Sequence, residues 1–164
     1  MPGTLAMQAR YRRIRERAYD QRRAEYPVLS VDPSFRDFVT LFIAEGSKRD
    51  RNKVAVANSD PAVITVCVAW LRRLSDRRVC CSVQVHEDQD LDEVRIWWAN
   101  VVGVAPEEIR LLRKSNSGRL KGRTWRSEHG VLTIWCNDTC LRARLQAWMD
   151  ELRSEWLTLT GPGA

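Results

Sequence analysis

A strongly basic segment, residues 110–126, contains the side chains of this chain that are best suited to bind phosphate. Its basic residues are Arg110, Arg113, Lys114, Arg119, Lys121, Arg123 and Arg126, and no acidic residue lies among them. Arginine and asparagine reach base edges in a DNA groove, and an aromatic ring stacks on bases, so Asn116 and Trp125 join this group. Because seven like charges repel one another without a counter-ion, we expect nucleic-acid contact rather than a solvated surface loop.

Two further segments carry polar side chains that could contact DNA. Residues 47–53 form a loop with four bases and one acid, in which the predicted DNA contacts are Arg49, Arg51 and Lys53. Residues 79–86 alternate as a strand with one apolar face. The opposite face of that strand carries Ser82, Gln84 and His86. We expect this polar face to be free to meet a ligand.

The net charge of the chain favours a polyanionic partner over a merely basic soluble protein. The 164 residues carry 27 basic and 21 acidic side chains, which gives a formal charge of +6 and a pI ≈ 9.4. Most of the basic residues are arginine, whose planar guanidinium suits phosphate and guanine edges better than lysine does. Residues 10–26 carry seven arginines against three acids. This pattern favours a basic arm along a phosphate backbone over a solvated helix.

Other functional classes find little support in the sequence. No run of about 18 apolar residues could span a membrane and no signal-peptide segment is visible, so we expect a cytoplasmic protein without a membrane partner. The five cysteines lack paired C-x-x-C spacing and are expected to be buried thiols rather than zinc ligands. Residues 86–90 resemble a metal-ligand cluster, but a polar turn in which Asp90 begins the next helix is the better interpretation. No phosphate-binding glycine loop or nucleophile motif indicates a small-molecule substrate.

The hydrophobic pattern predicts the elements that position these side chains. Helices are expected at residues 32–46, 60–74, 90–103 and 138–157, and strands at residues 53–58, 79–86, 109–114 and 131–136. Strands interspersed with helices indicate an α/β (α+β) domain with a small antiparallel or mixed four-stranded sheet.

The helix predicted at residues 32–46 ends in an unusual carboxylate. Asp32 followed by Pro33 is typical of a helix start, and Gly46 is typical of a stop. Residues 38–44 carry no charge, so we expect protein to cover nearly the whole circumference of the helix. Glu45 then lies at the negative end of the helix dipole, which is unfavourable for an anion unless a cation or a function holds it there.

This helix also carries a resemblance to a known family. The stretch Phe38-Val39-Thr40-Leu41-Phe42-Ile43-Ala44-Glu45-Gly46-Ser47 resembles the LAGLIDADG motif of homing endonucleases and their stand-alone bacterial relatives. The resemblance covers about residues 32–157, which leaves residues 1–31 as a basic N-terminal arm or helix and residues 158–164 as a disordered tail. The chain departs from the motif at Thr40, where glycine is usual, at Ile43, which replaces the first acid, and at Glu45, where aspartate is more frequent.

The resemblance implies a homodimer that binds double-stranded DNA on a saddle-like sheet. Two copies of the helix would pack across a dyad through an interface formed by Phe38, Thr40, Leu41 and Ala44. Glu45 of each copy would bind Mg²⁺ for phosphodiester cleavage, and Lys48 or Lys114 would offset the charge that develops on the phosphate. A two-fold dimer would read a roughly palindromic site selectively.

Three functions follow from this resemblance. The first is metal-dependent cleavage of duplex DNA, and the second is DNA binding by a transcriptional regulator that does not cleave. The third is RNA binding or a role in splicing, which relatives of this fold are known to adopt. Salt-sensitive binding without metal is expected of the regulator. Competition between duplex DNA and structured RNA separates the third function from the other two.

Overall fold

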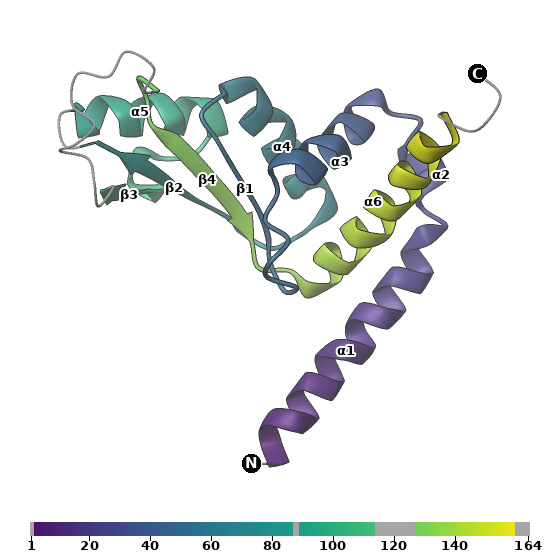
Figure 1. The fold of residues 1–164 in the computed structure, drawn as a ribbon. Helices are drawn as coiled ribbons and strands as arrows, with labels where there is room; N and C mark the ends of the chain where they lie inside the picture. Colours follow the sequence, from purple (N-terminus) through teal and green to yellow (C-terminus); the bar gives the residue numbers. More distant parts are fainter. Residues whose placement is uncertain (1, 87–88, 114–126, 160–164) are drawn as a thin grey trace. The chain divides into compact units, whose positions relative to one another are not determined.

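The computed structural model describes residues 2–86, 89–113 and 127–159, and the chain divides into two compact units. Unit 1 combines the first 54 residues with the chain from residue 137 onward, and unit 2 is residues 55–136. The described residues form a mixed α/β fold with six α-helices and an open four-stranded mixed sheet (Figure 1), which confirms the predicted fold class at this level. None of the described helices has both the length and the apolar character needed to cross a membrane.

Seven of the residues predicted to contact DNA lie outside the described residues. They are Lys114, Asn116, Arg119, Lys121, Arg123, Trp125 and Arg126. The predicted role of Lys114 in cleavage lies outside the described residues too.

In unit 1, α6 (Thr139–Leu159) packs against both α1 (Pro2–Arg23) and α3 (Pro33–Glu45), and the short α2 (Tyr26–Leu29) connects α1 to α3 (Figure 1). The buried stripe of α6 follows helical spacing and includes Leu141, Leu145, Trp148 and Leu152. Trp148 meets Phe35 of α3 edge to face, with ring centroids 5.1 Å apart and planes at 78°. Residues 158 and 159, predicted to be part of a disordered tail, are the last residues of this helix.

The basic N-terminal segment is a helix that packs on α6. Ala18 of α1 is buried, and the Tyr19 hydroxyl donates a hydrogen bond to Asp150 of α6 at 3.1 Å. Just beyond α1, Glu25 forms an ion pair with Arg144 of α6 at 3.1 Å. The boundary predicted between residues 31 and 32 therefore does not coincide with the division of the chain, because α1 and α3 belong to the same unit.

The helix α3 begins and ends at the predicted residues. Asp32 is its N-cap and accepts a hydrogen bond from the Ser34 amide at 3.0 Å, and Pro33 is the first helical residue. Gly46 follows the last helical residue in an extended conformation, φ −71° and ψ 145°, and not in the left-handed conformation common at helix ends. The glycine is required for another reason: a Cβ atom there would lie 2.5 Å from the carbonyl oxygen of Phe42.

Protein covers one face of α3 and not its whole circumference. The buried face carries Phe35, Phe38, Val39 and Phe42, each fully inaccessible to solvent. Thr40 and Ala44 are exposed on the other side, and Leu41 is half-buried. Phe38, predicted to lie at an interface between copies, is buried within its own chain, whereas Thr40 and Ala44 are accessible.

Unit 2 is built on a sheet with strand order β1-β4-β2-β3. The strands are β1 (Val54–Asn58), β2 (Val79–Val85), β3 (Ile109–Arg113) and β4 (Val131–Cys136). β2 runs antiparallel to β4 and parallel to β3. A parallel pair needs a crossover, which α5 (Leu91–Val102) and a 3₁₀ turn (Pro106–Glu108) provide. The helix α4 (Pro61–Leu74) packs against α5 and against β4 and β2, while α5 also packs on β3.

The register of the sheet corrects the prediction for the polar face of β2. Ser82 pairs with Arg110 on one side and with Thr133 on the other, so its short side chain lies in the middle of the sheet and is only 5% exposed. His86 follows the end of β2 and is only 8% exposed. Gln84 is exposed as predicted. Of the three polar residues expected to meet a ligand, two are therefore buried.

Aspartate side chains begin the two helices of unit 2, as the sequence predicts. Asp60 accepts a hydrogen bond from the Ala62 amide at 2.8 Å at the start of α4. Asp90 accepts from the amides of Asp92 and Glu93, each at 3.0 Å, at the start of α5. Asp90 is therefore the N-cap of α5, as the sequence predicts.

Candidate functional site

A basic pocket in unit 1 is the most distinctive candidate site in the described chain. It has a volume of about 470 Å³ and lies between α1, the loop after α3 and α6. Its basic residues are Arg15, Lys48, Arg51 and Arg142. Two carboxylates, Glu16 and Asp20, also line it, so the lining carries an excess of positive charge. The volume is typical of pockets that bind small ligands.

Arg142 is the most unusual member of this pocket because it is a buried cation. Its side chain is only 5% exposed, although arginine is rarely buried without a paired acid. The guanidinium lies over the ring of Phe42, 5.6 Å from the centroid, and donates one hydrogen bond to Gln146 Oε1 at 3.3 Å. Its Nε is buried and has no hydrogen-bond partner within the described ranges. Burial, followed by the nearby charge of Arg51, lowers the pKa of Arg142 from its usual value.

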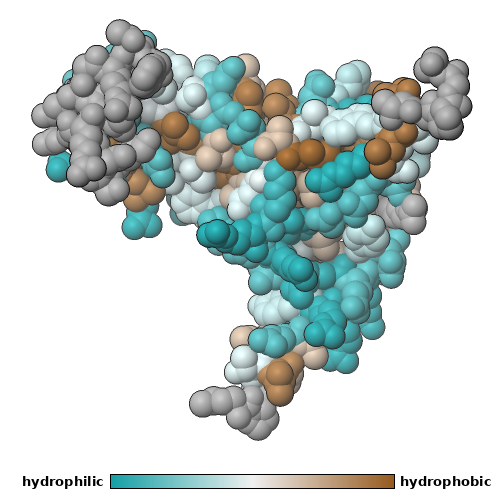
Figure 2. All heavy atoms as spheres, viewed as in Figure 1, coloured by the Kyte–Doolittle hydropathy of each residue, from teal (hydrophilic) through white to brown (hydrophobic). Residues whose placement is uncertain are grey.

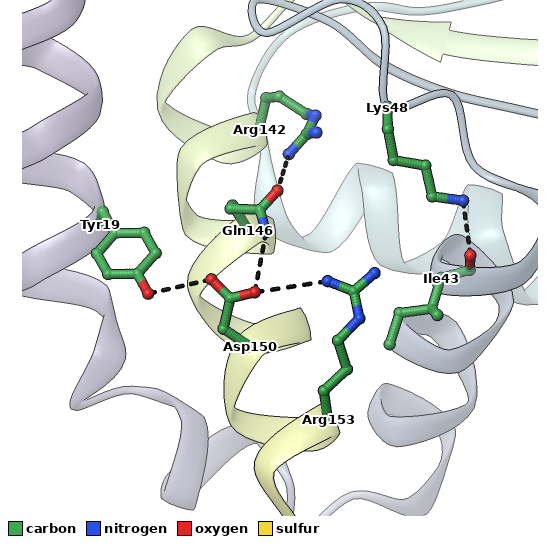
Figure 3. Close-up of polar contacts among 7 residues, drawn as sticks. All are labelled: Tyr19, Ile43, Lys48, Arg142, Gln146, Asp150 and Arg153. Atoms are coloured by element: carbon green, nitrogen blue, oxygen red, sulfur yellow. Dashed lines mark hydrogen bonds and ion pairs between the residues drawn. The ribbon is translucent and has the colours of Figure 1, made fainter.

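Lys48 is a second cation near the same phenyl ring. Its ammonium group is 5.9 Å from the Phe42 centroid and donates to the backbone carbonyl of Ile43 at 2.6 Å, near the C-terminal end of α3 (Figure 3). A cation is favourable at that end of a helix. Partial burial, then the positive charges of Arg153 and Arg142, lower the pKa of Lys48, while Glu45 opposes this shift. The cations of the site therefore repel one another, and a bound anion would relieve that repulsion.

A chain of hydrogen bonds along α6 holds the floor of the pocket (Figure 3). Gln146, which accepts from Arg142, donates in turn to Asp150 at 3.0 Å. Asp150 also accepts from the Tyr19 hydroxyl at 3.1 Å and forms an ion pair with Arg153 at 3.5 Å. Three donors share this carboxylate, and its charge, with that of Asp50, offsets part of the lowering of the Arg142 pKa.

A second basic groove follows the exposed side of α1. It has a volume of about 390 Å³ and is lined by Arg10, Arg13, Ile14 and Arg17. Arginines at positions i, i+3 and i+7 lie on the same side of a helix. Arg15, on the same helix, lines the larger pocket. Basic side chains of α1 therefore border both features of unit 1.

The structure brings together only part of the predicted site. In unit 1, Lys48 and Arg51 line the pocket, Arg49 is exposed, Lys53 is half-buried, and Glu45 is exposed at the end of α3. In unit 2, Gln84 and Arg110 are exposed on one face of the sheet, because Gln84 lies two residues from Ser82, the partner of Arg110. Arg113 is exposed at the end of β3. The buried Ser82 and His86 are not available on that face.

Sequence reasoning misses two arginines of the pocket. It does not single out Arg142, and it counts Arg15 only as one charge of the basic segment. A signal for Arg142 is present, because it falls three residues before Leu145 and seven before Met149, on the apolar stripe of α6. A charged residue on such a stripe must be either paired or placed at a site.

The Mg²⁺ site that the resemblance implies would be shared by Glu45 of two copies of the chain. Among residues 2–86, 89–113 and 127–159, no group of three or more histidine, cysteine, aspartate or glutamate side chains is placed to hold a metal ion. Glu45 is exposed, and its charge acts on Lys48. The predicted binding of Mg²⁺ by Glu45 of two copies therefore stays a prediction.

Comparison with protein-family models, curated proteins and solved structures finds no match to this chain. The LAGLIDADG assignment therefore stays a prediction from residues 32–157, and support for a function comes from the site alone.

Proposed function

We propose that this protein binds double-stranded DNA through the basic surface of unit 1. The observation that carries the proposal is the pocket in which Arg15, Lys48, Arg51 and Arg142 converge without an equal number of acids. Phosphate is the anion that arginine clusters of this kind recognise best, through paired hydrogen bonds from a planar guanidinium. The formal charge of +6 adds a long-range attraction to a polyanion.

The groove on α1 extends this surface over the length of a short DNA segment. Arg10 and Arg17 are seven residues apart, which corresponds to roughly 10 Å along a helix axis. That length corresponds to about three axial phosphate spacings, of roughly 3.4 Å each, on one strand of B-form DNA. Arg10, Arg13 and Arg17 therefore cover a length over which one strand presents about four phosphates, and the pocket lies beside the same helix.

Salt dependence tests this proposal directly. The affinity for a fluorescent duplex is measured at several salt concentrations for the wild type and for Arg13→Gln/Arg17→Gln. If both arginines contact phosphates, the slope of log affinity against log salt falls by about 1.8 in the variant. The matched control is Arg73→Gln/Arg77→Gln in unit 2, which removes the same charge and is expected to keep the slope. No measurable binding at low salt, or equal slopes in all three proteins, would refute the proposal.

We further propose the two more specific features that the resemblance implies, a homodimer and a saddle-like sheet that holds the duplex. The exposed side of α3 supports the dimer, because Thr40 and Ala44 are small and four residues apart, which allows a second helix to approach closely. Ala44→Arg is then expected to convert a dimer to a monomer in sedimentation experiments. A wild type that sediments as a monomer at all concentrations removes this part of the proposal and leaves DNA binding by a single chain.

Cleavage is a separate question that a matched variant decides. Duplex DNA is incubated with Mg²⁺ and either the wild type or Glu45→Gln, which keeps the size of the side chain and removes its charge. If Glu45 holds the metal, only the wild type cuts. If both proteins bind the duplex and neither cuts it, the protein is a DNA-binding protein without nuclease activity. Equal cutting by both would remove Glu45 from the mechanism.

A further inference from the structure

The buried Arg142 points to a ligand more specific than a general polyanion. Among the described residues, its guanidinium has one hydrogen-bond partner, Gln146 Oε1, and its Nε has none. A buried donor without a partner costs free energy that some other interaction must offset. The side chain also lines an accessible pocket of about 470 Å³, so an anion can reach it from solvent.

The surroundings of Arg142 favour an anion over a neutral ligand. Arg51 and Lys48 line the same pocket, and the charge of Arg142 lies near enough to Lys48 to lower the pKa of that amine. Glu16 and Asp20 also line the pocket, but the four bases outnumber them. Asp50 and Asp150 act on Arg142 as well, but burial and the charge of Arg51 outweigh them, and the pKa of Arg142 is lowered. An anion that accepts hydrogen bonds in several directions would bind more than one of these donors at once.

We propose that this pocket binds a single phosphate group, with Arg142 as the buried donor at its floor and Lys48 and Arg51 as donors around it. A phosphate offers three or more acceptor oxygens and matches the fork of a guanidinium. Arg142 and Lys48 both contact the ring of the buried Phe42, which limits the reorganisation needed on binding. The phosphate comes either from the DNA backbone, in which case the inference rests on the proposed function, or from a free phosphate compound.

Titration calorimetry with inorganic phosphate tests the pocket itself. We expect the wild type to bind phosphate and Arg142→Gln to bind it at least tenfold more weakly. Arg51→Gln is the second variant, because Arg51 is exposed and its removal leaves the core intact; we expect a loss of about threefold or more. Arg77→Gln in unit 2 is the charge-matched control and keeps the wild-type affinity. No binding of phosphate by the folded wild type up to about 10 mM, or equal affinities in all variants, would overturn the proposal.

A DNA-binding measurement with the same proteins identifies the source of the phosphate. If Arg142→Gln weakens duplex binding and free phosphate competes with the duplex, the pocket holds a backbone phosphate. If Arg142→Gln loses phosphate but binds the duplex as the wild type does, the occupant is a free phosphate compound, and the pocket stands apart from DNA binding. If phosphate binds the wild type and duplex DNA does not, the proposed function fails while the phosphate site is supported.

Discussion

Replacing Gly46 by alanine tests why α3 ends where it does. At φ −71° and ψ 145°, the backbone of Gly46 is one that alanine adopts without strain. Space is the constraint: a Cβ would lie 2.5 Å from the carbonyl oxygen of Phe42 and 2.6 Å from Cε2 of its ring. The carbonyl is backbone and accepts the Gly46 amide at 3.0 Å, so it has little freedom to move.

Gly46→Ala should lower the free energy of unfolding if this steric conflict exists and raise it if the conflict is absent. If no conflict existed, Gly46→Ala would stabilise the protein by about 0.4–1 kcal/mol, because alanine restricts the unfolded chain. Overpacking a filled position costs about 1–3 kcal/mol. We therefore expect a net loss of about 1–2 kcal/mol in the free energy of unfolding, or a fall in Tm of roughly 2–8 °C for a chain of this size.

Urea denaturation followed by far-UV circular dichroism measures this difference, and a double-mutant cycle locates its cause. Phe42→Leu removes the ring that the new Cβ would strike, so Gly46→Ala should cost less in that background, with a coupling energy of about 0.5–1 kcal/mol. The carbonyl contact would persist in both backgrounds. A Gly46→Ala protein at least as stable as the wild type would refute the steric explanation.

Two further predictions concern buried ionisable groups. Burial, followed by the hydrogen bond with Glu155, raises the pKa of Tyr26 to about 12. The folded state therefore favours the neutral phenol, and this contribution to the free energy of unfolding is complete below about pH 10. About 2 kcal/mol of it is lost as the pH rises from 10 to 12. The pH dependence of the urea midpoint should show this loss in the wild type and not in Tyr26→Phe, and identical profiles would contradict it. Burial also raises the pKa of Cys67 to about 12 and that of Cys81 to about 11, whereas Cys140 is exposed. With Ellman's reagent at pH 8, Cys140 should react first, and Cys67 and Cys81 should react only in denaturant. Rapid reaction of Cys67 or Cys81 in the folded Cys140→Ser variant would contradict this prediction and show that the core opens.

Polar and apolar residues both contribute to the surface of the molecule. Figure 2 shows hydrophilic residues over much of the visible face. Exposed apolar side chains also occur, among them Val28, Val31 and Leu157. Single exposed apolar residues are normal on a soluble domain. The basic pocket and groove of unit 1, which combine several charges in one place, are therefore the more informative features.

Much of the secondary structure could be predicted because its determinants are local. Asp32 with Pro33, Asp60 and Asp90 each begin a helix through a hydrogen bond to an amide two or three residues along the chain. The strand predicted at residues 131–136 has the extent of β4. Two members of the candidate pocket, Lys48 and Arg51, could also be identified in this way, because they belong to a short segment dense in positive charge.

Tertiary structure decided the features that depend on residues far apart in the sequence. Alternation along the strand predicts an exposed Ser82, but the pairing of β2 with two neighbours places it at the centre of the sheet. The sequence places Arg142 on the apolar stripe of its helix, but only the fold sets it near Phe42, a hundred residues earlier in the chain. Charge and helix boundaries follow from composition and local hydrogen bonds, whereas burial and the convergence of cations follow only from packing, because each depends on which distant residues become neighbours.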